Sequence, residues 1–169
     1  EKDLEQAHFT LGFESPDYRD PQIYTAQIYS TALGGGMSSR LFQEVREKRG
    51  LCYSIYAQAG AYADTGMTTI YAGTSGAQVA ELAATTIDEL KRAAEDMNST
   101  EIARARTQMK AGMVMGLESP SSRAERQARM LSIWDHIPDL SETVDRIDSV
   151  TDDDVRHFAE HMAVVARPA

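Results

Sequence analysis

An arginine and a tyrosine seven positions apart are the first residues in this sequence whose types suggest chemistry. Arg46 falls near the end of a short charged segment, Tyr53 near the start of an aromatic one, and Gly50 lies between them. Because a glycine commonly ends a helix and reverses the chain, both side chains are expected above one helix–strand corner. A guanidinium and a phenol offer hydrogen-bond donors to a carbonyl oxygen or an oxyanion. The pair is therefore a candidate site for binding a polarised substrate oxygen.

Structural alternatives exist for both members of this pair. Tyr53 has the same strand parity as the apolar residues Ile55, Ala57 and Ala59, which is the pattern of a core tyrosine. Arg46 lies beside the apolar stripe of its helix, where a solvated flanking arginine is common. The residues alone leave both interpretations open.

The segment "HFAEH" is a second candidate, because His157, Glu160 and His161 match the H-x-x-E-H pattern of inverted zinc peptidases. Two imidazoles four positions apart on a helix can share one Zn²⁺, with the glutamate as general base. The apolar residues of this helix, however, predict that both histidines point to solvent; they are Val155, Phe158, Ala159 and Met162.

A third protein ligand for such a zinc is also hard to find. Only eight residues follow His161, and the spacing of Asp135 or Glu142 does not favour either of them. We therefore interpret His157, Glu160 and His161 as a chance match and predict no metal in this chain.

Three consecutive glycines, Gly34, Gly35 and Gly36, come before the arginine segment. They are not a P-loop, because "GGGMSSR" lacks the lysine that such a loop requires. Two interpretations remain open: a flexible kink between two helices, or a backbone segment that approaches a ligand closely.

The elements that position these residues follow from hydrophobic periodicity. A strand is predicted over "EQAHFTLGFE", where alternate residues are apolar, and a helix from Pro21 up to the glycines. A second short helix is predicted over residues 38–48, with an apolar stripe of Leu41, Phe42 and Val45.

Beyond Gly50, the expected helix C-cap, an antiparallel hairpin is predicted between Leu51–Tyr62 and Met67–Gly73. A long amphipathic helix follows the hairpin. Helix caps are predicted at Asn98, which forms a capping box with Glu101, and at Ser141 and Thr151. Pro120 breaks the helical pattern, and "AVVAR" is predicted as a last strand. The predicted class is α+β, a largely antiparallel sheet backed by helices.

Composition excludes several classes of function. The net charge of −9 argues against general nucleic-acid binding, and no apolar run approaches the roughly 18 residues of a membrane span. One cysteine, Cys52, excludes an internal disulfide and fits a reducing compartment.

The chain begins directly on "EKDLEQAHFTLGF", so residues 1–169 are interpreted as one domain of a longer protein.

The central motif resembles a known family. "LGGGMSSRLFQEVREKRGLCYSIYA" is similar to the C-terminal-half signature of the pitrilysin, insulinase and mitochondrial processing peptidase family, in its bacterial processing-peptidase-like branch. The similarity extends to "QAHFTLGF", to the predicted hairpin and to "GLESPSSRAERQARML", and so covers nearly the whole chain.

The resemblance implies a fold and a division of labour. Homologous halves face each other across a chamber, and zinc belongs to the N-terminal half, in the same chain or a second subunit. The metal-free C-terminal half supplies an arginine and a tyrosine, here Arg46 and Tyr53, that reach the substrate. Gly34, Gly35 and Gly36 would form a substrate loop where the helix pair bends at the chamber wall. "HFAEH" lies on the last helix, far from the position of that family's zinc helix.

The expected function is therefore the zinc-free, substrate-binding half of a zinc endopeptidase, inactive by itself. The main alternative is a non-catalytic structural or substrate-binding subunit of a processing-peptidase-like complex. A second is a compact enzyme that uses "HFAEH". The expected partners are the zinc-bearing half and a peptide, without nucleic acid or membrane. The expected location is the cytoplasm, with the periplasm as the alternative.

Overall fold

A computed structural model describes residues 5–166 of the chain. It contains three strands and a series of helices, which confirms the predicted α+β class. In chain order the elements are β1 (Ala7–Ser15), α1 (Ile23–Gly34), η1 (Phe42–Lys48), β2 (Ser54–Ala61), β3 (Gly66–Thr74), η2 (Gly76–Gln78), α2 (Val79–Asp96), α3 (Ser99–Gly116), α4 (Pro120–Trp134), α5 (Leu140–Ser149) and α6 (Asp152–Val165).

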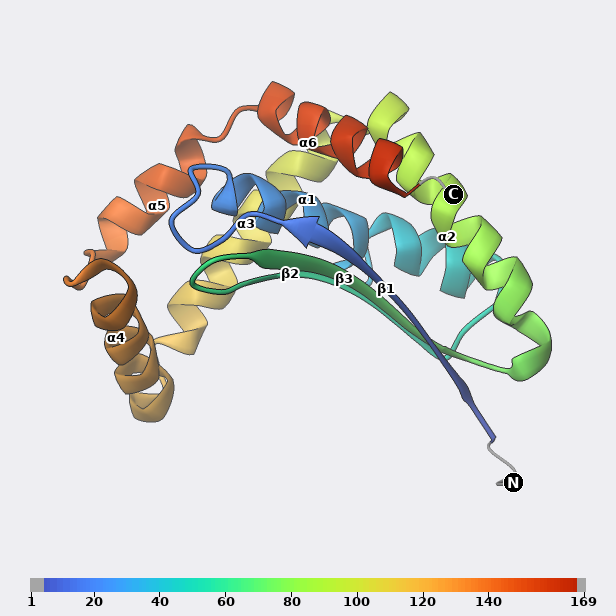
Figure 1. The fold of residues 1–169 in the computed structure, drawn as a ribbon, viewed down its shortest axis with the longest axis horizontal. Coiled ribbons are helices and arrows are strands. Elements are labelled where there is room, and N and C mark those ends of the chain that lie inside the picture. Colours follow the sequence, from blue (N-terminus) through green and yellow to red (C-terminus); the bar gives the residue numbers. More distant parts are fainter. Residues whose placement is uncertain (1–4, 167–169) are drawn as a thin grey trace.

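The sheet is antiparallel, with the strand order β1-β3-β2. The predicted hairpin is confirmed as β2 and β3, and Tyr56 pairs with Tyr71, which in turn pairs with Thr10 of β1. One face is buried: Ile55, Ala57, Ile70 and Ala72 are all less than a tenth exposed. Figure 1 shows α1, α2 and α6 over one face of the strongly twisted sheet.

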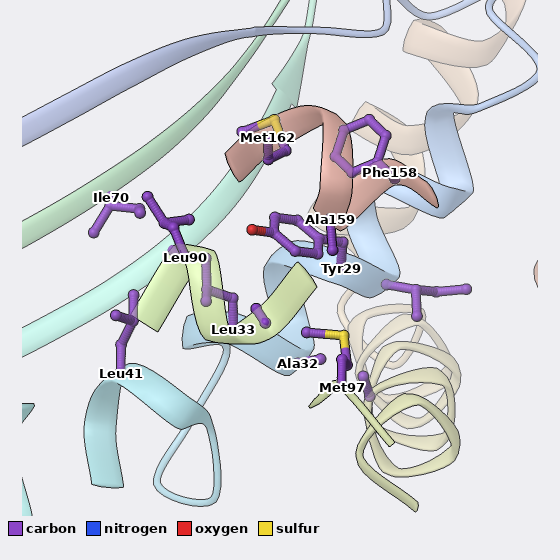
Figure 2. Close-up of a cluster of buried hydrophobic side chains, with 14 of the residues drawn as sticks. Tyr29, Ala32, Leu33, Leu41, Ile70, Leu90, Met97, Phe158, Ala159 and Met162 are labelled. Atoms are coloured by element: carbon purple, nitrogen blue, oxygen red, sulfur yellow. The ribbon is translucent and has the colours of Figure 1, made fainter. Parts of the chain in front are cut away.

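The core is centred on α1, which packs against β2, α3 and α6. Because neighbours surround it, α1 is buried on most of its surface rather than along a single stripe. Tyr29 is fully buried and meets the ring of Phe158 edge-on at 5.4 Å, as Figure 2 shows among the surrounding aliphatic side chains. Helix α6 thus closes the core over α1.

Helix starts follow the predicted caps in most places. Asn98 and Thr151 both form capping boxes, with Glu101 and Asp154 respectively. The chain also restarts as α4 at Pro120, which occupies the first helical turn after the Ser119 cap.

Two sequence predictions about the C-terminal part are wrong. The N-cap position of α5 is Asp139, and Ser141 lies inside the helix. The segment "AVVAR" is not a strand, because α6 continues through Val165 and Ala166 occupies its C-cap; Arg167 lies outside the described residues. Local β propensity is overridden because Met162 and Ala166 are buried on the same helical face.

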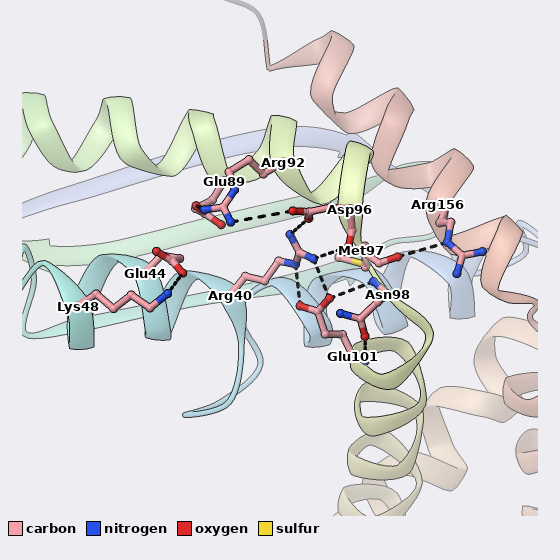
Figure 3. A network of polar contacts seen from close by, with 10 residues as sticks. All are labelled: Arg40, Glu44, Lys48, Glu89, Arg92, Asp96, Met97, Asn98, Glu101 and Arg156. Carbon is pink, nitrogen blue, oxygen red and sulfur yellow. Dashed lines mark hydrogen bonds and ion pairs between the residues drawn. The ribbon is translucent and has the colours of Figure 1, made fainter.

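A polar network joins the segment before η1 to the α2–α3 connection (Figure 3). The guanidinium of Arg40 donates two hydrogen bonds of 2.7 Å to the Glu101 carboxylate and also pairs with Asp96. Its side chain is only 10% exposed, so these bonds replace most of its water. The network fixes the start of η1 against the helical layer.

Within residues 5–166, no helix has the length and apolar character needed to cross a membrane.

Candidate functional site

The predicted arginine helix is present, but it winds as a π-helix rather than an α-helix. Leu41 and Val45 are fully buried and hold η1 against the core, while Phe42 packs at its edge. A π-helical turn is rare and often occurs at functional sites. This winding sets the direction in which Arg46 leaves the helix.

Gly50 ends η1 as predicted. It has a φ of +62°, a left-handed conformation that suits glycine and disfavours residues with a Cβ. Its N–H donates to the Arg46 carbonyl at 3.1 Å, and the Leu51 N–H donates to the Val45 carbonyl at 3.0 Å. These two bonds close the helix end and turn the chain toward β2.

The strand side of the corner is equally fixed. The Tyr53 N–H donates to the Gly73 carbonyl at 2.8 Å, and the buried Thr74 hydroxyl donates to the Leu51 carbonyl. The Gln78 side-chain amide reaches the Gly50 carbonyl at 3.4 Å. Residues 50–53 are therefore held from both sides, which gives the Tyr53 side chain a defined starting direction.

Tyr53 is 62% exposed, so the interpretation as a core tyrosine is wrong. The alternation of β2 begins only at Ser54, and the backbone bends just before it, so strand parity does not extend back to Tyr53. In the described part of the chain its hydroxyl has no hydrogen-bond partner. An exposed phenol on a fixed corner is available to a bound ligand.

Arg46 is partly held by its own helix. Its guanidinium carbon lies 4.5 Å from the centroid of the Phe42 ring, and its nearest carboxylate, Glu47, is 3.9 Å away. The side chain remains 39% exposed. Stacking on an aromatic face leaves the N–H edge of a guanidinium free to donate. Among residues 5–166, no hydrogen bond or ion pair links Arg46 to Tyr53, and their joint action on one ligand stays a prediction.

Cys52 lies in the same corner but is not suited to nucleophilic chemistry. The residue is buried, and burial raises the pKa of its thiol, an effect that the nearby Arg46 charge only partly offsets. The thiol is therefore protonated at neutral pH, and a thiol is a poor nucleophile compared with its thiolate.

The glycine triplet has a packing role that the sequence did not reveal. A Cβ on Gly34 would lie 2.3 Å from the Ala57 nitrogen, and one on Gly35 would lie 2.7 Å from the Thr31 carbonyl oxygen. The Gln108 side chain donates to the Gly35 carbonyl at 2.6 Å. Beyond Gly36 the chain reaches the surface at Met37, which is highly exposed. Close approach of α1 to β2 thus requires Gly34, whereas a substrate-loop role for Gly34, Gly35 and Gly36 stays a prediction.

The "HFAEH" helix is α6, and the predicted buried stripe is confirmed. Val155, Phe158, Ala159 and Met162 are buried, and His157, Glu160 and His161 are exposed. Within the described range no three His, Cys, Asp or Glu side chains are grouped so that they could hold a metal ion. Both histidines therefore lie on an outer helix face, and the interpretation of "HFAEH" as a chance match stays a prediction.

Sequence reasoning missed a set of aromatic residues on the second face of the sheet. Tyr56 and Tyr71 stack with their centroids 5.1 Å apart, and His8 hydrogen-bonds the Tyr71 hydroxyl at 2.8 Å. Tyr56 is 42% exposed. The available signal was strand parity, because all three lie opposite the buried positions of their strands.

Comparisons with known proteins identify the family of this chain. Residues 1–109 match the model described as "Peptidase M16 inactive domain". The chain is 42% identical over 156 residues to an uncharacterized zinc protease of Streptomyces coelicolor, covering 92% of this chain and 34% of the relative. It is 36% identical over 164 residues to an uncharacterized zinc protease of Bacillus subtilis, covering 95% of this chain and 40% of the relative.

Among solved structures, a peptidase M16 inactive domain from Pseudomonas fluorescens superposes with a TM-score of 0.78 at 21% identity, over 92% of this chain and 38% of that one. A chain of complex III from Candida albicans gives a TM-score of 0.85 at 20% identity, over 95% and 41% respectively. At this level of identity the likeness shows the fold alone.

Fold and matches together define a half-domain of the metallopeptidase type. The chain belongs to the peptidase M16 family, as its inactive domain, and the resemblance seen in the central motif is confirmed. The chain spans between a third and two fifths of the length of these two curated relatives. The activity of the whole protein is therefore a matter for proposal.

Proposed function

We propose that this chain is the zinc-free half of a zinc endopeptidase and closes on extended peptides together with a homologous zinc-bearing half. The observation that carries the proposal is the exposed Tyr53 phenol on a fixed corner beside Arg46, in a chain of the M16 inactive-domain family. The zinc-bearing half would belong to the same protein or to a second subunit. Its metal would polarise the scissile carbonyl and activate water.

The part of this chain in catalysis would be hydrogen bonding to substrate. Tyr53 would donate its hydroxyl proton to the substrate carbonyl oxygen or to the oxyanion that develops from it. Arg46 would add a charged donor whose side chain is already ordered on Phe42. Because residues 50–53 are pinned by the sheet, little ordering entropy would be lost when the phenol engages the substrate.

The test is Tyr53→Phe in the full-length protein, measured with a fluorogenic peptide. Loss of one oxyanion donor is expected to lower kcat by about 10²–10³-fold, with zinc content unchanged. Tyr62→Phe is a matched control, because Tyr62 is similarly exposed but lies beyond the opposite end of β2, about 30 Å along the strand.

Full activity of the Tyr53→Phe variant would contradict the role of Tyr53. Absence of both zinc and peptidase activity in the unmodified full-length protein would instead favour the alternative of a non-catalytic subunit.

A further inference from the structure

A cavity of about 310 Å³ opens where the start of α1 meets α3, α4 and α5, and the peptidase role does not use it. Figure 1 shows α4 and α5 at the end of the molecule away from α2. The cavity wall is mostly apolar and unusually rich in methionine, with Met109, Met113 and Met130 beside Trp134 and Ile147. Methionine side chains adapt to varied apolar shapes. The site therefore has the character of a small-molecule pocket rather than a packing defect.

Helix α4, which forms one wall, is incompletely packed. None of its residues is fully buried, although Met130 and Trp134 face the cavity. One tie to the rest of the chain is Arg19, whose guanidinium donates to the Ile133 carbonyl at 2.8 Å. An occupant of the cavity would complete the apolar contacts that α4 lacks.

Two arginines bring positive charge to this apolar wall. Arg126 lines the cavity and donates to the Thr143 hydroxyl at 3.2 Å, and the guanidinium of Arg146 lies 5.3 Å from the centroid of Tyr24. In the part of the chain that the structure describes, neither arginine has a carboxylate within 4.0 Å. In a protein of net charge −9, one guanidinium in the cavity wall and a second stacked on Tyr24, neither ion-paired within residues 5–166, favour an anionic ligand.

Tyr24, which also lines the cavity, supplies a third donor. Burial raises the pKa of Tyr24, while the nearby charges of Arg146 and Arg126 lower it and Glu142 raises it. The phenol therefore keeps its proton at neutral pH and can donate. Glu142 is the carboxylate that would oppose an anion here.

We propose that this cavity binds a monocarboxylate with an apolar tail, its carboxylate held by Arg126 and the Tyr24 hydroxyl and its tail among the methionines and Trp134. A volume of 310 Å³ corresponds to roughly ten water-sized groups, the size of an eight-carbon acid. A bare anion such as phosphate would leave the apolar wall unfilled, and a neutral hydrocarbon would leave the guanidinium unpaired.

Octanoate is the probe, and Trp134 is the reporter, because it is the only tryptophan in the sequence and lies in the cavity wall. We expect saturable binding with a blue shift of tryptophan emission in the 169-residue chain. Octanol has the same length but no charge, and it should bind the unmodified chain at least about tenfold more weakly than octanoate does. Octanoate should bind the Arg126→Gln variant at least about tenfold more weakly than it binds the unmodified chain. In both cases one charge-assisted hydrogen bond is lost.

Arg129→Gln is the matched control, since Arg129 lies one turn along α4, is exposed and pairs with Glu125 at 2.7 Å. Its octanoate affinity should equal that of the unmodified chain. Glu142→Gln should tighten octanoate binding, because it removes the opposing charge. Circular dichroism of every variant separates loss of binding from loss of fold.

Equal binding of octanoate and octanol would overturn the proposal, as it would show a merely apolar cavity. An Arg126→Gln variant that folds and binds octanoate normally would also overturn it, and so would the absence of saturable binding in the millimolar range. None of these results would bear on Tyr53, so this proposal and the peptidase proposal fail independently.

Discussion

At the residue scale, Tyr53 and Arg46 show how little of a site depends on residue type alone. A tyrosine in a β-rich stretch is commonly a core residue, and alternation with Ile55 predicted that outcome. The structure exposes Tyr53 because the strand begins one residue later, after a corner made by Gly50. Its availability thus depends on the Gly73 carbonyl, which accepts from the Tyr53 N–H, and on the Thr74 hydroxyl, which donates to the Leu51 carbonyl. Both residues lie about twenty positions away and have no sequence signal.

Arg46→Lys tests whether the planar guanidinium matters rather than the charge. Lysine keeps the charge but loses the fork of donors and stacks less well on Phe42, so we expect kcat/KM of the full-length protein to fall about tenfold. Because the side chain is 39% exposed, stability should change by less than about 0.5 kcal/mol.

The control for this change is Arg49→Lys, an exposed arginine at the end of the same helix. If Arg46→Lys and Arg49→Lys have the same peptidase kinetics as the unmodified protein, Arg46 acts only as a solvated cation and has no directional role.

At the element scale, the contact between α1 and β2 sets the position of the candidate site. Gly34→Ala would place a Cβ 2.3 Å from a strand nitrogen and 2.7 Å from the Ala57 side chain. Backbone cannot yield as a side-chain tip does, so we expect a loss of about 1–3 kcal/mol or more in unfolding free energy, measured by urea denaturation.

Gly112→Ala is the matched control for that change. Gly112 also lies in a helix, and a Cβ there would meet nothing within 4 Å. Alanine should stabilise this exposed helical position by about 0.5–1 kcal/mol. A Gly34→Ala protein as stable as the Gly112→Ala protein would show that α1 can move away from β2 without cost.

Much of the element order could be predicted because its signals are local. Capping boxes at Asn98 and Thr151 and the left-handed Gly50 each depend on a few adjacent residues. The π-helical winding of η1, the packing role of Gly34 and the helical state of Val164 and Val165 depend on neighbours distant in sequence. Tertiary packing overrides local propensity at those places, so the sequence alone predicts the element and misses its details.

At the scale of the whole molecule, the fold gives the sheet one covered face and one solvated face. Helices α1, α2 and α6 cover one face of the sheet (Figure 1). Tyr56 and Tyr71 stack on the other face. In the proposed peptidase role, this solvated sheet face would enclose an extended peptide against the zinc-bearing half. The chain has, within residues 5–166, no grouped side chains that could hold a metal ion themselves.

The isolated 169-residue chain is therefore expected to hold no zinc after exhaustive dialysis and to hydrolyse no peptide, and addition of the zinc-bearing half should restore hydrolysis. Zinc content is tested by mass spectrometry of the unmodified chain and of a His157→Ala, His161→Ala double variant. One zinc per chain that the double variant loses would mean that α6 binds metal on its exposed face. Zinc near zero in both proteins would leave the catalytic metal to the other half. Within residues 5–166 no third ligand is grouped with the two exposed imidazoles, and two imidazoles alone hold zinc too weakly to survive dialysis.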